Sequence, residues 1–138
     1  MGVSHAAERA RRRIADEHQD VITGVDACAA AVSHRWEGDS TGDRAAVVEP
    51  LRSCLDARGL LARLPSVLAD AVEATGHALA APPVAAPPYV VVTSQGPVLR
   101  ATIDPGRLVI RFEVFTVVRG SEPSYRRLEG TRLAVSLE

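Results

Sequence analysis

Lysine and asparagine are absent from this 138-residue sequence, and aromatic residues are few. All 16 basic side chains are therefore arginine, against 17 acidic side chains, and the formal net charge is −1. A charge this close to balance excludes a strong overall field that would draw the chain toward nucleic acid or an anionic membrane. Binding to such partners would have to be local.

Long apolar runs are also missing. The longest, from Leu79 to Val92, contains four prolines, whereas a membrane-spanning helix needs about 20 apolar residues. Residues 1–15 are charged where a secretory signal has an apolar stretch. We therefore expect a cytoplasmic protein with no membrane partner.

Cysteine and catalytic motifs are scarce. Cys28 and Cys54 form no CxxC motif and fall in amphipathic stretches, which predicts two free thiols packed as small apolar side chains. The sequence has no GxSxG motif and no phosphate loop. We expect no cofactor and no metal, and the sequence favours a non-enzymatic protein while leaving catalysis open. Four histidines match no zinc-binding spacing: His5, His18, His34 and His77.

The chain does contain enough apolar material for one domain. Its length of 138 residues and its 46% hydrophobic content predict a single α+β domain with one core. It divides into a helical half over residues 1–79, a proline-rich spacer over 80–88, and an antiparallel sheet over 89–138.

The helical half shows the apolar spacing of helices. Apolar or small residues recur at intervals of three and four over residues 4–37, which predicts one long helix that Gly24 weakens or bends. A second helix is expected over residues 43–59, where Pro50 either begins the helix or bends it, and a third helix should start at Pro65. We expect these helices to form a three-helix unit packed on one face of the sheet.

After the spacer the apolar period changes to two, and β-branched residues dominate. This pattern predicts an antiparallel meander of about four strands, over residues 89–94, 98–103, 108–118 and 131–137. Residues 125–128 are either strand, with a bulge near Gly130, or a short helix; strand is favoured because the long third strand needs a partner. The first two turns are expected to centre on Gln95-Gly96 and Pro105-Gly106.

Two-residue turns at these sites fix which strand residues face each other. Leu99 then faces Phe112, Ala101 faces Ile110, and the first hairpin places Val92 opposite Leu99. Each of these pairs is apolar. The face that carries them should be the core against the helices.

About half of the residues on the opposite face are also apolar, whereas a face meant for water alternates to polar residues. We expect this face to bind another protein or a second copy of the chain. His18 interrupts the apolar stripe of the first helix, where a hydrogen-bonded core or interface histidine is more common than a metal ligand. The residues expected at the interface are Val91, Val98, Val109, Phe115, Val117 and His18.

The same register sets Arg100 across from Arg111, with Glu113 diagonal to Arg100. Opposed like charges on a sheet are unfavourable unless something neutralises them. Either Glu113 and solvent neutralise the two arginines, or the paired guanidinium groups bind a small carboxylate or phosphate.

Nucleic-acid binding is another alternative. Arg126 and Arg127 beside Tyr125 can stack on a base, and Arg100 and Arg111 would add to this surface. The sheet half carries seven arginines against five acidic residues. The basic run over residues 9–13 is interpreted instead as an exposed helix with internal ion pairs. A self-associating interaction domain is favoured over nucleic-acid binding and over a small-anion module.

The stretch PPYVVVTSQGPVLRATIDPGRLVIRF, residues 87–112, resembles small uncharacterised proteins of halophilic archaea, as does the lysine-free, arginine-, alanine- and valine-rich composition. The resemblance includes no functional motif. It implies a cytoplasmic protein of unknown role and transfers no site residue.

Overall fold

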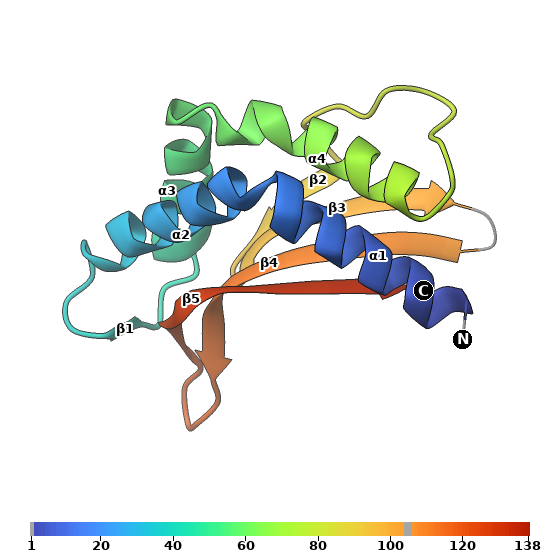
Figure 1. Cartoon of the computed structure of the whole chain (residues 1–138). Coiled ribbons are helices and arrows are strands. Elements are labelled where there is room, and N and C mark those ends of the chain that lie inside the picture. Colours follow the sequence, from blue (N-terminus) through green and yellow to red (C-terminus); the bar gives the residue numbers. More distant parts are fainter. Residues whose placement is uncertain (1, 104–105) are drawn as a thin grey trace.

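A layer of helices covers one face of a five-stranded antiparallel sheet in the computed structural model of the chain (Figure 1). The structure describes residues 2–103 and 106–138. The α+β class, with helices before strands, is confirmed. Within the described residues, however, the chain forms four helices rather than the expected three.

Two helices replace the single long helix expected over residues 4–37. α1 spans Gly2–Glu17 and α2 spans Gln19–Ser33, and they part at His18, whose backbone leaves the helical region with φ −127° and ψ 31°. The bend expected at Gly24 is wrong, because this glycine lies inside α2. A Cβ at Gly24 would press on the side chain of Leu60, so glycine here permits close packing between helices.

The other two helices each contain a proline. α3 spans Ala45–Ala57 and α4 spans Leu60–Ala74, and Pro50 and Pro65 occupy the sixth position of their helices. Neither proline begins a helix, so the start predicted at Pro65 is wrong. α4 begins earlier because Leu60, one turn before the fully buried Leu64, is itself buried. None of the described helices is long and apolar enough to cross a membrane.

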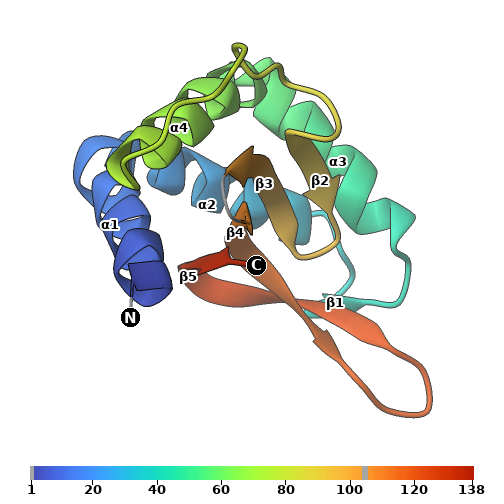
Figure 2. The ribbon, with the colours of Figure 1, turned by 90° about the vertical axis from the view of Figure 1, so that its right-hand side faces the viewer.

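The sheet has the strand order β1-β5-β4-β3-β2. The predicted four-strand meander is confirmed as β2 to β5, and residues 125–128 are strand. β1 was not expected; it lies between the regions predicted as the first and second helices and pairs with β5. Residues 80–88 form neither helix nor strand, as expected, and the spacer runs alongside α4 toward β2 (Figure 2). The strands span Ser40–Thr41 (β1), Val90–Thr93 (β2), Gly96–Ile103 (β3), Gly106–Val118 (β4) and Ser124–Leu137 (β5).

The bulge expected near position 130 of β5 is confirmed. Glu113 pairs with Arg132, and Phe115 pairs with Arg127. Residues 128–131 of β5 therefore lie opposite a single residue of β4, and the alternation of side chains changes there.

The register of both hairpins differs from the prediction by two residues. Leu99 pairs with Ile110 rather than Phe112, and with Val90 rather than Val92. A shift of two keeps each side chain on its predicted face. The core prediction is confirmed for this reason: Leu99, Ile110 and Phe112 are fully buried.

The glycines assigned to the turn centres are instead the first residues of strands. Gly96 pairs with Thr93, and Gly106 pairs with Ile103. Pro105, the other residue predicted at the second turn centre, lies outside the described residues.

Close backbone contacts explain why glycine occupies these positions. A Cβ on Gly96 would collide with the carbonyl oxygen of Phe112, and a Cβ on Gly106 would collide with that of Glu138. Both glycines serve the approach of a neighbouring strand rather than the turn. Turn signals alone therefore predicted the wrong register.

Replacing Gly96 should test this constraint. Gly96→Ala should lower the free energy of unfolding by about 3 kcal/mol or more, because alanine is strained in this backbone conformation and its methyl group would displace a strand. The φ of Gly96 is +141°. Urea denaturation measures the change. Gly120→Ala is the control, since nothing lies within 4 Å of its Cβ position; equal losses in both variants would contradict the role given to Gly96.

Candidate functional site

The sheet face turned away from the helices is not covered by any described helix (Figure 1). Alternation along the strands decides which side chains lie on this face. We call it the open face and define it by the outward-facing residues of β2 to β5: Val91, Thr93, Val98, Arg100, Thr102, Arg107, Val109, Arg111, Glu113, Arg132, Ala134 and Ser136.

Two of the four arginines on the open face have acidic partners. Arg132 Nε donates to Glu113 Oε1 at 2.8 Å. Arg111 Nη2 lies 3.4 Å from Glu138 Oε2, and Arg111 Nη1 donates to Ser136 Oγ at 3.5 Å. These contacts compensate two positive charges within the face.

Arg100 and Arg107 are the other two arginines, and both are exposed. Among the described residues, neither guanidinium group forms an ion pair. Glu138 exchanges backbone hydrogen bonds of 2.7 and 2.8 Å with Arg107, but its side chain pairs with Arg111. Thr102 lies directly opposite Arg107 and is the next outward-facing residue of β3 after Arg100. The three side chains share one corner of the open face, where β3 ends and β4 begins.

The predicted opposition of Arg100 and Arg111 is wrong. Arg100 lies opposite Val109, and Arg111 lies opposite Val98. Glu113, expected diagonal to Arg100, is held by the ion pair described above. The arginine stems can cover the valines beside them, and Val98 is only 7% and Val109 only 1% exposed. Much less apolar surface is therefore open to a partner than the sequence predicts.

A pocket of about 430 Å³ adjoins the corner formed by Arg100, Thr102 and Arg107. Its volume lies in the range of small-molecule sites. Most of the remaining lining comes from the spacer and the segments flanking it, and these residues are Leu79, Ala80, Ala81, Pro88 and Tyr89.

A backbone amide at the edge of β3 adds a donor near this pocket. Arg100 N donates to Tyr89 O at 2.9 Å, and alternation directs the amide of Thr102 to the same side of the strand. β2 does not extend that far. Within the described part of the chain, no group accepts a hydrogen bond from Thr102 N.

Phe115, expected at an interface, is instead in the core. It is 1% exposed and packs against Trp36, with ring centroids 5.5 Å apart. The amides of Val114 and Phe115 both donate to Gln95 O, at 2.8 Å and 3.1 Å. The irregularity opposite the β5 bulge therefore turns Phe115 inward, which simple alternation could not predict.

Tyr125, Arg126 and Arg127 do not join Arg100. Tyr125 packs against the core, and Arg127 Nη2 lies 3.2 Å from both carboxylate oxygens of Asp26. These three residues lie opposite residues 115–117 of β4, far along the strand from the pocket. The arginines expected to bind nucleic acid together are therefore split between two places.

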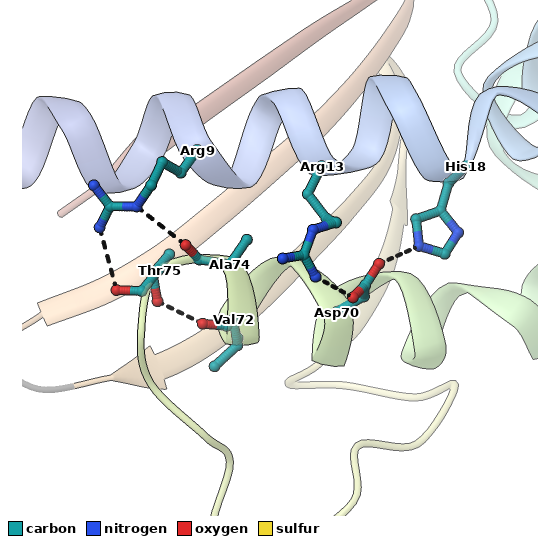
Figure 3. A network of polar contacts seen from close by, with 7 residues as sticks. All are labelled: Arg9, Arg13, His18, Asp70, Val72, Ala74 and Thr75. Atoms are coloured by element: carbon teal, nitrogen blue, oxygen red, sulfur yellow. Dashed lines mark hydrogen bonds and ion pairs between the residues drawn. The ribbon is translucent and has the colours of Figure 1, made fainter.

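Asp70 of α4 stabilises the break between α1 and α2 through its contacts with Arg13 and His18 (Figure 3). Its Oδ1 accepts from Arg13 Nη1 at 2.7 Å, and its Oδ2 lies 2.8 Å from His18 Nε2. An ionised carboxylate can only accept, so His18 Nε2 carries the hydrogen. His18 is thus partly buried within the chain and makes a structural contact.

Other members of the basic run also hold α1 in place. Arg9 donates to Ala74 O at 3.2 Å and to Thr75 O at 3.4 Å, which satisfies carbonyls at the C-terminal end of α4, where a positive charge is favourable (Figure 3). Arg11 donates to Leu133 O at 3.2 Å. The expected exposed helix with internal ion pairs is confirmed for Arg12, whose Nη2 lies 3.8 Å from Glu8 Oε1. The partners of Arg9 and Arg11 were missed, because long-range partners cannot be recognised from local spacing.

Two opposing effects act on the pKa of Asp70. Burial raises this pKa, but the hydrogen bonds and charges of His18 and Arg13 outweigh burial and hold it below its ordinary value of 3.8. A carboxyl whose pKa is lowered by folding stabilises the protein above the unfolded-state pKa. That stabilisation is lost as the pH falls below 3.8 toward the folded-state pKa.

Asp70→Asn should lower the free energy of unfolding at pH 7 by about 1 to 2 kcal/mol, because charge-assisted hydrogen bonds are lost at a partly exposed site. Urea denaturation of both proteins at pH 7 and at about pH 2.5 measures the change. The difference should shrink at the lower pH as the wild-type carboxyl becomes protonated.

The control for this experiment is Asp16→Asn, at an exposed carboxylate with no ion pair among the described residues. It should change stability by less than about 0.5 kcal/mol. If Asp70→Asn lowered the free energy of unfolding by the same amount at both pH values, the negative charge of Asp70 would play no part in the stabilisation.

Cys28 is a buried thiol with little tendency to ionise. Cys28 and Cys54 are free thiols, as expected, and burial together with a hydrogen bond to Cys54 raises the pKa of Cys28 to about 12. A thiol with this pKa remains protonated near neutral pH. Across residues 2–103 and 106–138, no three His, Cys, Asp or Glu side chains are grouped so as to hold a metal ion.

The fold and the pocket define a class of protein: an α+β domain with one helix-covered and one open sheet face, with arginine, hydroxyl and amide groups at one corner of the open face. The chain belongs to the family described as Domain of unknown function (DUF7988), whose model matches residues 8–138. No curated protein and no solved structure matches it. The family description states no function and names no organism group.

Proposed function

We propose that the protein is a non-enzymatic binding domain whose ligand is an anion held at the corner formed by Arg100, Thr102 and Arg107. One observation carries the proposal. The two arginines border one pocket and have no carboxylate partner among the described residues, whereas Arg111 and Arg132 on the same face do.

The chemistry of this corner suits an anion. Two nearby guanidinium groups repel each other unless a negative charge lies between them, and arginine forks bind carboxylate or phosphate by two hydrogen bonds at once. The hydroxyl and amide of Thr102 supply further donors. An anion would satisfy all of these groups.

Thermal unfolding tests the proposal. Inorganic phosphate or citrate at ten times its Kd should stabilise the protein by about 1.4 kcal/mol, which raises Tm by about 3 to 5 °C for a chain of this size. Arg100→Ala should remove the increase. Arg52→Ala, at an exposed arginine of α3, should keep it.

Sodium chloride at matched ionic strength separates specific binding from general salt effects. If neither anion stabilised the wild type beyond chloride, the proposal would be wrong. It would also be wrong if Arg100→Ala kept the full increase.

We propose self-association as a second function, which a different observation favours. The hairpin formed by the ends of β4 and β5 projects from the rest of the molecule (Figure 2). On it, Val118 is 41% exposed beside the half-buried Val117. An apolar side chain on projecting strands suits contact with a second copy.

Light scattering should give a mass about twice the monomer mass of 14.6 kDa. Val118→Glu should return the protein to a monomer, because a charge cannot be buried cheaply at the contact. Val84→Glu is the control, since Val84 is 56% exposed elsewhere on the surface. A wild-type mass of 14.6 kDa at the highest attainable concentration would rule out self-association.

A further inference from the structure

We infer that the ligand of this corner is a phosphate monoester with an apolar body, bound between the end of β3 and the proline-rich spacer. The inference rests on the anion site proposed above. It adds the chemical class of the ligand and the orientation of its two ends.

The size of the pocket indicates that the ligand is larger than an inorganic anion. Its volume of about 430 Å³ falls in the range of about 300 to 1,000 Å³ that sites for organic ligands occupy. A bare phosphate or carboxylate at the arginines would leave most of this space to water. An organic body attached to the anion would fill it.

The charge at the corner favours phosphate over carboxylate. Arg100 and Arg107 together carry two positive charges, and a phosphate monoester carries about −1.5 to −2 at pH 7. A single carboxylate would leave one guanidinium uncompensated. The three terminal oxygens of the monoester also offer enough acceptors for two guanidinium forks and the two donors of Thr102.

The rest of the lining forms an apolar wall that comes from a different part of the chain. Leu79, Ala80, Pro88 and Tyr89 belong to it, and Leu79 and Tyr89 also pack against the core. The wall is therefore held in place by the fold. A ligand with its phosphate at the strand corner would lay its apolar or aromatic body against the spacer.

Calorimetric titration with three probes tests both halves of this assignment. Phenyl phosphate has the dianion and a ring, inorganic phosphate lacks the ring, and phenyl sulfate keeps the ring with a single negative charge. Phenyl phosphate should bind about tenfold or more tightly than either of the other two probes. Arg100→Ala should abolish binding of both phosphate compounds.

Two variants test the apolar wall. Leu79→Ala should reduce the preference for phenyl phosphate over inorganic phosphate, whereas Val84→Ala, in the adjoining spacer but outside the pocket, should preserve it. Because Leu79 packs on the core, Ala80→Glu provides a second test at an exposed position. Its added negative charge should weaken phenyl phosphate, and Val84→Glu should not.

The outcomes separate this inference from the proposed anion site. Equal affinities for phenyl phosphate and inorganic phosphate, both lost in Arg100→Ala, would overturn the organic ligand and leave the anion site standing. Phenyl sulfate binding as tightly as phenyl phosphate would overturn the assignment to phosphate. If none of the probes bound and citrate gave no thermal stabilisation, both proposals would be wrong.

Discussion

The close approach of backbone to backbone at Gly96 and Gly106 determines how the sheet is assembled. The Cβ of a residue at position 96 of β3 would meet the carbonyl oxygen of Phe112 on β4, and one at position 106 of β4 would meet that of Glu138, directly after β5. The Gly96 contact therefore favours one register of β3 on β4, and the Gly106 contact favours one register of β4 on β5. The resulting register places Arg100 opposite Val109 and Thr102 opposite Arg107. Sliding by two residues would preserve the buried face but would bring Arg111 beside Arg100 and separate Thr102 from Arg107. The pocket corner thus depends on a constraint that the core alone does not impose.

The helices contribute by covering only one side of this sheet. Three arginines of α1 make polar contacts with the rest of the fold. Arg9 donates to the C-terminal end of α4, Arg13 donates to Asp70 in the middle of α4, and Arg11 donates to the backbone of β5. These contacts hold α1 and α4 together. After α4, the spacer runs along this helix toward β2 (Figure 2). That path brings Leu79 and Pro88 to the end of β3, where they form the second wall of the pocket. The same layer that stabilises the core therefore also shapes the candidate site.

Local patterns predicted the features that depend on local physics. Apolar periods of 3.6 and 2 separated the helical half from the sheet half, and alternation assigned Leu99 and Ile110 to the buried face. Features set by distant contacts were missed. The helix break at His18 is stabilised by the carboxylate of Asp70, 52 residues away. β1 forms by pairing with β5, which lies far from it in the sequence. Arg100 remains a candidate binding residue, but the arginine that shares its pocket is Arg107 rather than Arg111, because the register differs from the one that the turn signals predict.

The β3–β4 register is tested most directly by nuclear Overhauser effects between Hα protons. Arg100 N donates to Tyr89 O on β2, so Arg100 faces β4 in a non-hydrogen-bonded pair, in which Cα atoms approach to about 4.5 Å. We expect a strong effect between the Hα protons of Arg100 and Val109. A strong effect between Arg100 and Arg111 instead would contradict this register, because the corner shared by Arg100, Thr102 and Arg107 would then not form.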